Sequence, residues 1–544
     1  MGMTAAIDIT TEQRKTLLAL LRRFIPGVAV WAYGSRVKWA ARPNSDLDLV
    51  AFTSPAQRHL VSELKDAIGE SNLPFLVDLH VWDEVPERFY EIIRKEYIVL
   101  QETEEERPGG AMAGEWATTR LGQVAAINPD AIGRDWPFAH IRYIDISSVK
   151  EGQIEVSPQW MKVSDAPSRA KRLVRKGDTV LSTVRPNRRS MFFVSQPGED
   201  WVVSTGFAVL RPKTPFIDPR FLYACVFDQA FTEYLITREK GAAYPAVSPE
   251  DIANAELSIP PLKEQQAIGS ILGTLDDKIE LNRRMNETLE AMARAIFKSW
   301  FVDFDAVRAK TAGQQPAGLK PELAALFPDS FEGSELGDIP KGWKVSIVGV
   351  ELTTLLGGTP SRAEPNYWEG GTIPWINSGK ANEFRIIQPS EYITQVGMEN
   401  SATKLLPQRT TVIAITGATL GQVSLLEIAA CANQSIVGIL SSEQIPSEFI
   451  YFWIKLNVAE LVARQTGGAQ QHINKNDVNA LKLLLPPETV MRAYYQQAKP
   501  LFDSIRNNCF KSRTLAAIRD ALLPKLISGE LRVPDAERIA GRYV

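Results

Sequence analysis

Two segments of the chain carry hydrophobic residues at every seventh position. The first lies within residues 263–304 and the second within residues 489–533. The repeating positions are Ile268, Leu275, Asn282, Leu289 and Ile296 in the first segment and Tyr494, Leu501, Asn508, Leu515 and Leu522 in the second, with Ile271, Met285, Met292, Ile505 and Ile518 at intermediate positions. This spacing is typical of long helices that pair as a coiled coil. The alternative is two ordinary amphipathic helices, each packed on its own domain.

A polar residue falls at the same place in both repeats, at Asn282 and at Asn508. A buried asparagine in a helix seam lowers stability but fixes the register of the two helices. We therefore predict that the helices pair and that the two asparagines lie within about 15 Å of each other, because paired helices are about 8–10 Å apart. Pro500 and Pro524 predict a start and a kink in the second helix.

The chain also repeats itself at an offset of 226 residues. GAAYPAVSPEDIANAELSIPP from Gly241 lies over GGAQQHINKNDVNALKLLLPP from Gly467. Two copies of one module, each followed by a long helix, are therefore expected. The expected boundaries are 1–100 for a separate N-terminal domain, 101–114 for an acidic linker, 115–262 and 336–488 for the modules, 263–304 and 489–533 for the helices, 305–335 for a second linker and 534–544 for a tail.

The N-terminal domain carries a pattern of acidic residues. An apolar stretch ends at Tyr33 and is followed by Gly34-Ser35, ten further residues and Asp46-Leu47-Asp48. Alternate residues of a strand share a face, so Asp46 and Asp48 point the same way. Carboxylates in this arrangement can hold Mg²⁺ beside a nucleoside triphosphate, and FLVDLHVW supplies Asp78 as a third. A glycine lets the backbone approach phosphates.

GSRVKWAARPNSDLDL resembles the minimal nucleotidyltransferase family. The resemblance implies a small mixed sheet, a nucleoside triphosphate, catalytic and metal-binding roles for Asp46, Asp48 and Asp78, and nucleotide binding by Gly34, Ser35 and Arg36. Some members of that family are antitoxins that nucleotidylate a partner toxin, and others modify RNA or small molecules, so the acceptor is left open. The alternative is an unrelated loop followed by a surface pair of aspartates.

Composition narrows the range of partners. Of the 544 residues, 61 are Lys or Arg and 64 are Asp or Glu, which gives a formal charge of −3. Binding to nucleic acid would then depend on local patches. We see neither a secretory signal nor an apolar run of about 18 residues, so a cytoplasmic protein without a membrane partner is expected. Three cysteines and four histidines make a disulfide framework or a structural zinc site unexpected.

One basic patch lies between Ser168 and Ser190. This segment contains eight Lys and Arg residues and one Asp, which gives it a formal charge of 8 − 1 = +7. Arginine and asparagine make bidentate contacts to base edges, while lysine and arginine also meet phosphates. The expected base contacts are Arg185, Asn187, Arg188 and Arg189, the expected phosphate contacts are Lys171, Arg172, Arg175 and Lys176, and the expected DNA contacts of the second module are Lys380, Arg385, Gln470, Gln471 and His472. The alternative is a solvated basic face.

PPLKEQQAIGSILGTLDDKIELNRRMNETLEAMARAIFKSWFVDF, LFPDSFEGSELGDIPKGW, GGTPSR and the terminal LLPKLISGEL resemble the specificity subunit of type I restriction-modification systems. The resemblance implies two target recognition domains that read the unlike halves of a split double-stranded DNA sequence. It also implies helices that dock two methyltransferase subunits, together with restriction and translocase subunits as further partners. That part would need no cofactor and would catalyse nothing by itself; no Asn-Pro-Pro-Tyr methylation motif and no G-x-x-x-x-G-K-[ST] loop occurs.

The expected fold is therefore a multidomain α/β protein. A small mixed-sheet domain of the nucleotidyltransferase type precedes two α/β target recognition domains, which are joined by two long antiparallel coiled-coil helices. The alternative function is a nucleotidyltransferase, an antitoxin-like modifier of protein or RNA, whose C-terminal part only targets it. A solitary coiled-coil DNA-binding protein is a third possibility.

Overall fold

The computed structural model describes residues 7–541 except residues 27, 38–44, 54–57, 86–92, 94–96, 102–115, 134–135, 242–244 and 464–471. The chain forms two compact units, Met1–Ala117 and Thr118–Val544. Most of the expected acidic linker lies outside the described residues. Each unit is described separately below.

Unit 1 is built on one mixed sheet of order β3-β2-β1-β4. Its described elements are α1 (Thr11–Phe24), β1 (Val30–Tyr33), β2 (Leu47–Ala51), α2 (Arg58–Gly69), β3 (Val77–Val81) and β4 (Tyr97–Gln101). β2 is parallel to β3, and β1 is antiparallel to β2 and β4. Leu47 and Leu49 of β2 are buried with Leu17 and Leu21 of α1, because alternate strand residues face the helices. The predicted mixed sheet is confirmed.

The first module of unit 2 contains two four-stranded sheets, β10-β7-β14-β11 and β13-β12-β15-β6. Its strands are β5 (Ala117–Arg120), β6 (Ala125–Ile127), β7 (His140–Ile144), β8 (Val149–Lys150), β9 (Gln153–Ile154), β10 (Gln159–Lys162), β11 (Ala170–Leu173), β12 (Thr179–Ser182), β13 (Met191–Phe193), β14 (Trp201–Ser204), β15 (Phe207–Pro212) and β16 (Glu256–Ile259). Its helices are α4 (Leu121–Val124), α5 (Pro219–Phe227), α6 (Gln229–Ile236) and α7 (Pro249–Ala253).

The second module has a four-stranded sheet, β20-β26-β23-β24, and a three-stranded sheet, β22-β21-β25. Its elements are β19 (Lys344–Ile347), α11 (Val348–Glu351), β20 (Thr354–Leu356), β21 (Ile373–Ile376), β22 (Glu391–Ile393), α12 (Gln395–Glu399), β23 (Thr411–Ala414), β24 (Val423–Leu425), β25 (Cys431–Ala432), β26 (Ile436–Ile439), α13 (Ser447–Ala463), α14 (Lys475–Asn479) and β27 (Lys482–Leu485). Before it come α9 (Asp305–Thr311), α10 (Pro321–Ala324), β17 (Phe331–Ser334) and β18 (Gly337–Pro340).

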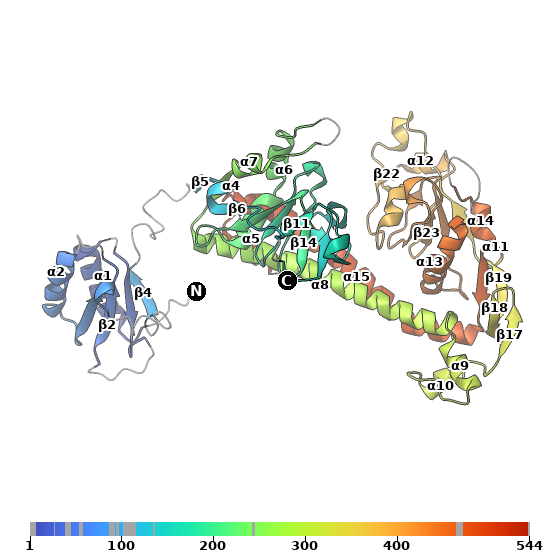
Figure 1. Ribbon diagram of the computed structural model, residues 1–544, viewed down its shortest axis with the longest axis horizontal. Coiled ribbons are helices and arrows are strands. Elements are labelled where there is room, and N and C mark those ends of the chain that lie inside the picture. The colour runs from blue at the N-terminus through green and yellow to red at the C-terminus, as the bar shows by residue number, and fades with distance from the viewer. Residues whose placement is uncertain are drawn as a thin grey trace. The chain divides into compact units, whose positions relative to one another are not determined.

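Two forty-residue helices, α8 (Leu262–Phe301) and α15 (Glu488–Ile527), lie side by side (Figure 1). Both ends of the two helices differ by the repeat offset, since 488 − 262 = 226 and 527 − 301 = 226. Asp276 contacts Arg519 and Asn286 contacts Asn508, so numbers rise along one helix as they fall along the other. The predicted antiparallel pair is therefore confirmed. A short helix, α16 (Val533–Ala540), follows and also contacts α8.

Helix α15 continues through Pro500, where the sequence predicts a start. Proline in a helix interior costs about 3 kcal/mol because it removes a backbone donor and crowds the preceding turn. Fully buried side chains on both sides of Pro500, Ala498 and Phe502, hold this part of α15 against its neighbours. Tertiary packing therefore overrides the local preference.

The seam of α8 does not keep the expected seven-residue spacing. Met285 and Met292 are 45% and 51% exposed. The buried positions instead recur every eleven residues, at Ile268, Ile279, Glu290 and Phe301 and at Leu275, Asn286 and Phe297. A straight α-helix has 3.6 residues a turn, so a strict heptad drifts away from the partner, whereas an eleven-residue spacing stays in line with it.

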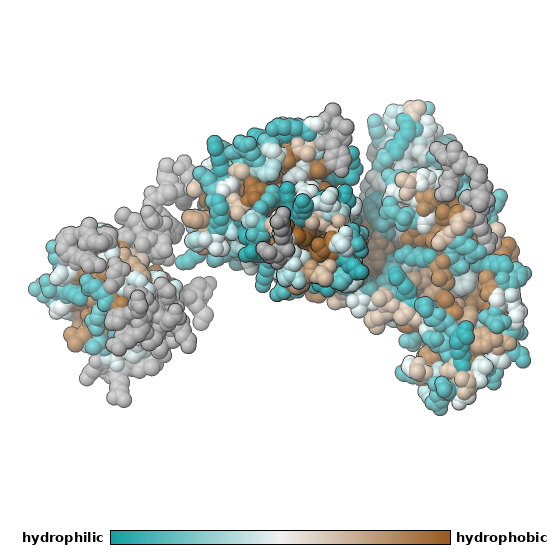
Figure 2. Space-filling view, in the orientation of Figure 1, coloured by the Kyte–Doolittle hydropathy of each residue, from teal (hydrophilic) through white to brown (hydrophobic). Residues whose placement is uncertain are grey.

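Hydrophobic residues form patches among hydrophilic ones on the visible face of the molecule (Figure 2). Within the described ranges, no helix combines the length and the apolar character that crossing a membrane requires. In the second module the end of α8 is part of the core, where Phe297 and Phe301 pack against Phe449 of α13 and Tyr494 of α15. The module is thus anchored to both long helices.

Candidate nucleic-acid interface and acidic site

The acidic site of unit 1 begins with a close contact between Gly34 and Asp48. Gly34 has φ +83°, and a β-carbon there would lie 2.1 Å from Asp48 Oδ2. A side chain would therefore be strained by its backbone and would also collide with the carboxylate. The turn after β1 accepts only glycine if Asp48 is to keep its position, which gives the Gly-Ser motif a structural reason.

Strand register places Tyr33, Asp48 and Asp78 in one row. Tyr33 is opposite Asp48, and Asp48 is opposite Asp78, so the three side chains share the face of the sheet that points away from α1 and α2. Burial raises the pKa of Asp48, and the charges of Asp78 and Asp46 raise it further. Burial, with the charges of Asp48 and Asp78, raises the pKa of Tyr33 to about 12. The row therefore concentrates negative charge.

The other residues expected at this site have different surroundings. Asp46 precedes β2 and is exposed, and Ser35 is half-buried. Arg36 is 6% exposed and donates to the carbonyl oxygens of Ser45 and Asp8 at 2.7–3.0 Å. The expectation that Arg36 binds a nucleotide is thus corrected, because its guanidinium is buried and holds the backbone around the β1–β2 connection. His80, which the sequence places on the same strand face as Asp78, contacts Asp78 Oδ2 through Nε2 at 3.0 Å.

Carboxylate oxygens are the ligands that Mg²⁺ prefers, so Asp48 and Asp78 fit such an ion chemically. The expected three-carboxylate cluster is nevertheless not assembled. Across the described residues, no group of three or more His, Cys, Asp and Glu side chains could hold a metal ion. A metal role for Asp46 together with Asp48 and Asp78 therefore stays a proposal.

A cavity of about 710 Å³ marks the candidate DNA-contacting face of the first module. It is lined by cationic residues, by three acidic residues and by small polar ones, among them Lys150, Arg169, Arg185, Asn187, Arg188, Asp145, Glu151, Glu155, Ser147 and Thr205. Arg185 and Arg189 have φ +50° and +51° at the two ends of the turn Pro186–Arg188. Positive φ in residues other than glycine is strained and is concentrated at functional sites.

The cavity brings together Arg185, Asn187 and Arg188 of the expected base contacts. Arg189 instead donates to the carbonyl of Phe227 at 2.6 Å and to Gln229 at 2.7 Å, so it anchors the turn to α5 and α6. The sequence places Arg169 in the basic patch without naming it as a DNA contact, and it does not single out Lys150 or Glu151. The dipeptide Glu151-Gly152 between two short apolar segments is a pattern that could have predicted this hairpin, in which Lys150 ends the first strand.

The expected phosphate contacts of the first module divide into two kinds. Lys171 and Lys176 are exposed. Arg175 is exposed but is paired with Asp130 at 2.8 Å, and Arg172 donates to Asn128 at 2.7 Å. Burial lowers the pKa of Arg172. None of the four lines the cavity.

In the second module the expected contacts are scattered. Lys380 is paired with Glu383 at 2.6 Å, and His472 is exposed. Gln470 and Gln471 lie outside the described residues. Arg385 has a fully buried side chain, contacts Glu290 of α8 at 3.1 Å and donates to Tyr451 of α13 at 2.9 Å. The expectation that Arg385 contacts DNA is therefore corrected: it ties the module to the long helix.

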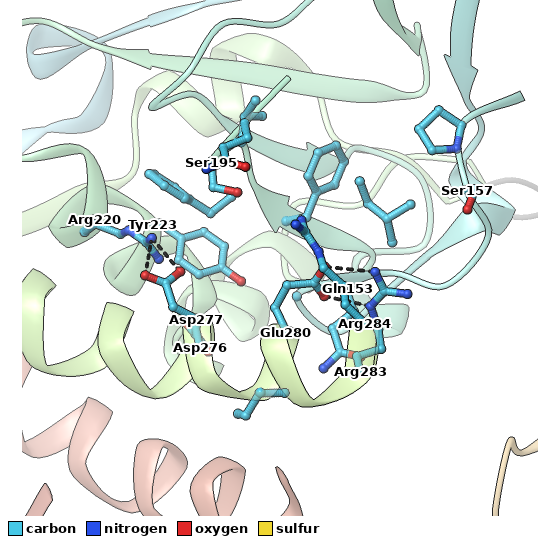
Figure 3. A pocket seen from close by; sticks show the side chains of 18 of the residues that line it. Gln153, Ser157, Ser195, Arg220, Tyr223, Asp276, Asp277, Glu280, Arg283 and Arg284 are labelled. Atoms are coloured by element: carbon cyan, nitrogen blue, oxygen red, sulfur yellow. Dashed lines mark hydrogen bonds and ion pairs between the residues drawn. The ribbon is translucent and has the colours of Figure 1, made fainter. Parts of the chain in front are cut away.

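Two ion pairs, one between the first module and α8 and one between the two long helices, lie beside a cavity of about 260 Å³ (Figure 3). Arg220 of α5 donates to both carboxylate oxygens of Asp277 at 2.7 and 2.9 Å. Asp276, the neighbouring residue of α8, pairs with Arg519 of α15 at 2.8 Å. Burial raises the pKa of Asp276, although the positive charge of Arg519 opposes this. The Arg220–Asp277 pair thus ties the first module to α8, and the Asp276–Arg519 pair ties α8 to α15.

Comparison with known proteins adds two findings. Residues 114–291 and 340–498, more than half of the chain, match the family described as Type I restriction modification DNA specificity domain. Residues 17–106 match the family described as Polymerase beta, Nucleotidyltransferase.

Individual relatives agree with these matches, and solved structures are also similar. The specificity subunit of the type I restriction enzyme HindI from Haemophilus influenzae is 29% identical over 415 residues, 68% of this chain and 90% of that protein. The probable protein adenylyltransferase MntA of the same organism is 44% identical over 101 residues, 18% of this chain and 89% of that protein. The crystal structure of the HsdS subunit from Thermoanaerobacter tengcongensis matches with 22% identity and a TM-score of 0.30, covering 78% of this chain and 98% of that one.

The family match covers both modules and parts of both long helices, and in the structure α7, β16 and α8 recur as α14, β27 and α15 at the same offset of 226 residues. The N-terminal unit matches a different family over most of its length. The chain belongs to the family of type I restriction-modification DNA specificity proteins and carries a nucleotidyltransferase domain at its N-terminus.

Proposed function

We propose that unit 2 is the specificity subunit of a type I restriction-modification complex, in which each module reads one half of a split double-stranded DNA sequence. The observation that carries this proposal is the repeat: two modules of similar topology are anchored to one antiparallel helix pair. A single chain then presents two reading surfaces, as a DNA-binding dimer does. Because the modules differ in sequence, the two half-sites are unlike.

In the first module the proposed reading surface is the cavity that contains Arg185, Asn187 and Arg188. Its basic residues suit a phosphate backbone, and arginine and asparagine suit guanine and adenine edges. Lys171 and Lys176, which are exposed outside the cavity, are proposed as phosphate contacts. In the second module Lys380, His472 and the glutamines of the 464–471 segment are proposed as DNA contacts.

Adenine methylation should be mapped across the genome of cells that carry this chain with its methyltransferase, and of cells that lack the chain. A split motif with two unlike halves that disappears without the chain supports the proposal. Asn187→Ala should relax one half of that motif only. Lys176→Ala is the matched control and should leave the motif unchanged while lowering its occupancy. Absence of any chain-dependent motif would overturn the proposal.

The exposed side of α8 is proposed as a docking surface for a methyltransferase subunit, with a second such subunit and the restriction and translocase subunits completing the complex. Leu281, Met285 and Met292 are 57%, 45% and 51% exposed and lie on one side of the helix. Large exposed apolar side chains of this kind mark protein interfaces. Met285→Glu combined with Met292→Glu should abolish co-purification with the methyltransferase without changing the melting temperature. Ala291→Glu, also exposed on α8, is the control and should retain the complex.

A second activity is proposed for unit 1, namely transfer of a nucleotidyl group to a hydroxyl of a protein, such as a toxin partner, or of RNA. The contact between Gly34 and the Asp48 carboxylate supports it, as does the register that joins Asp48 to Asp78. In the proposal Asp48 and Asp78 hold Mg²⁺, which supplies charge neutralisation for the triphosphate, and Gly34 and Ser35 approach the phosphates. The acceptor oxygen bonds to the α-phosphorus, pyrophosphate leaves, and the acceptor's proton passes to solvent.

ATP labelled at the α-phosphate should transfer label to a co-purifying protein or RNA. Asp48→Asn should abolish the labelling and leave DNA methylation unchanged, because the two activities reside in separate units. Asp66→Asn, on α2, is the control and should retain the labelling. Labelling that survives Asp48→Asn would contradict the proposal.

A further inference from the structure

A strained hairpin loop forms part of the cavity in the first module. β8 and β9 are antiparallel and are joined by the two residues Glu151 and Gly152, which have φ +39° and +91°. Two positive φ values in a two-residue loop are the signature of a type I′ turn, whose first position favours Asn, Asp or Gly. Glutamate is disfavoured there because its β-carbon crowds the following carbonyl oxygen.

The surrounding packing holds this loop in place. The backbone N–H of Glu151 donates to the carbonyl of Arg189 at 3.0 Å, and that of Gly152 donates to the carbonyl of Met191 at 2.9 Å. A β-carbon on Gly152 would lie 2.9 Å from Tyr223 Oη. The tip of the hairpin is therefore fixed to the segment that follows Asn187 and Arg188. Strain that is maintained by packing in this way is typical of functional positions.

The side chain of Glu151 is unusual for its surroundings. It is exposed and lines the same cavity as Lys150, Arg185 and Arg188. In the described portion of the chain its carboxylate makes neither a hydrogen bond nor an ion pair. A carboxylate repels the phosphates that the neighbouring cations attract, so it weakens general DNA binding. Its presence is explained if it meets a hydrogen-bond donor on the DNA.

We propose that Glu151 is a specificity-determining residue that accepts a hydrogen bond from the exocyclic amino group of a base, N4 of cytosine or N6 of adenine, in the major groove. The inference rests on the proposed function of unit 2. Cytosine and adenine present an amino donor in that groove, whereas guanine and thymine present only acceptor atoms there. The carboxylate therefore attracts cytosine or adenine at the position that it contacts and repels guanine or thymine there.

A double-mutant cycle tests the inference. The intact complex with its methyltransferase, carrying either the wild-type chain or the Glu151→Ala variant, is titrated with a duplex that contains the chain-dependent motif. Each protein is also titrated with DNA in which one cytosine or adenine of the first half-motif is replaced by 2-pyrimidinone or purine, which lack the amino group. At the position that Glu151 reads, each single change should weaken binding about 5- to 150-fold. The double change should weaken binding no further than either single change.

Two further variants make the outcome unambiguous. Glu155→Ala removes another acidic residue of the cavity and should give additive effects at the same base. Glu151→Gly relieves the strained loop, so it should raise the melting temperature and still lose the discrimination. Additive effects of Glu151→Ala at every cytosine and adenine of the half-motif would overturn the inference. If the wild-type complex does not prefer the motif over a scrambled duplex, the proposed function of unit 2 fails instead.

Discussion

Asn508 Nδ2 on α15 donates to Asn286 Oδ1 on α8 at 3.0 Å, and both side chains are buried. One turn away, Asn282 Nδ2 donates to Ser512 Oγ at 3.1 Å. The two asparagines singled out by the sequence therefore lie on the same seam, but each is bonded to a different residue. These polar side chains can hydrogen-bond across the seam in only one alignment of the two helices. They therefore fix the register of the antiparallel pair.

Asn508→Ala should lower the free energy of unfolding by about 1–3 kcal/mol, because it leaves the buried amide of Asn286 without its partner. Replacing both asparagines by leucine should restore most of that loss. Denaturant titration followed by circular dichroism measures both effects. Asn507→Ala, which removes an exposed neighbour, is the control and should change the value by no more than about 0.5 kcal/mol. Equal effects of Asn507→Ala and Asn508→Ala would contradict the assignment.

Arg385→Ala should destabilise the second module rather than weaken a DNA contact. Burial would raise the pKa of Glu290, but the charges of Arg385 and Lys455 hold it below its ordinary value, so the carboxylate is ionised and depends on them. Removing one partner of a buried ion pair costs about 3–5 kcal/mol. Thermal unfolding should show this loss, whereas Lys404→Ala, at an exposed position, should be nearly neutral. Unchanged stability with weaker DNA binding would contradict the placement of Arg385.

Glu427 should make the second module more stable at mildly acidic pH. Its side chain is fully buried, and burial raises its pKa to about 6 although Arg409, Arg385 and Arg506 oppose this. The folded state then binds a proton more tightly than the unfolded state. Stability is therefore gained as pH falls from about 6 to about 4.5, by up to about 2 kcal/mol.

The measurement is the difference between the wild type and Glu427→Gln, because other groups titrate in the same range. Burial also raises the pKa of Glu448, which has the same sign, and the lowered pKa of Glu290 has the opposite sign. The contribution of Glu290 cancels in the difference, and the charge of Glu448 is one of the influences on Glu427 that the difference reports. A difference that does not change between pH 4.5 and pH 7 would show that Glu427 has an ordinary pKa.

Gly34→Ala should damage unit 1 at its acidic site. The left-handed backbone costs a residue with a β-carbon about 1–2 kcal/mol, and the contact of 2.1 Å requires Asp48 to move. Melting of unit 1 and nucleotidyl labelling should therefore both be reduced. Gly69→Ala is the matched control, because a β-carbon there meets nothing within 4 Å. A neutral Gly34→Ala would mean that the turn is looser than the structure shows.

Local patterns in the sequence were enough to identify several elements. The offset of 226 residues gave the two modules, and seven-residue spacing gave the two paired helices. The spacing of Gly34, Asp48 and Asp78 indicated a strand pair with acidic residues on one face. Such features depend on residues close in sequence or on a repeated period, because local backbone geometry fixes which side chains share a face.

Other features were decided by tertiary structure alone. Arg385 lies in a polar segment that the sequence predicts to be exposed. The structure buries it because Glu290, 95 residues earlier in the chain, pairs with its guanidinium. Met285 and Met292 follow the heptad, yet the drift of a straight helix turns them outward. No sequence pattern distinguishes Glu151 as a candidate contact, and only the hydrogen bond from its backbone to Arg189 shows that it lies beside the predicted base contacts. The partners of Arg385 and of the hairpin are distant in sequence, and the orientation of the two methionines depends on how a straight helix lies against its neighbour, so neither the spacing nor the composition of the sequence shows these features.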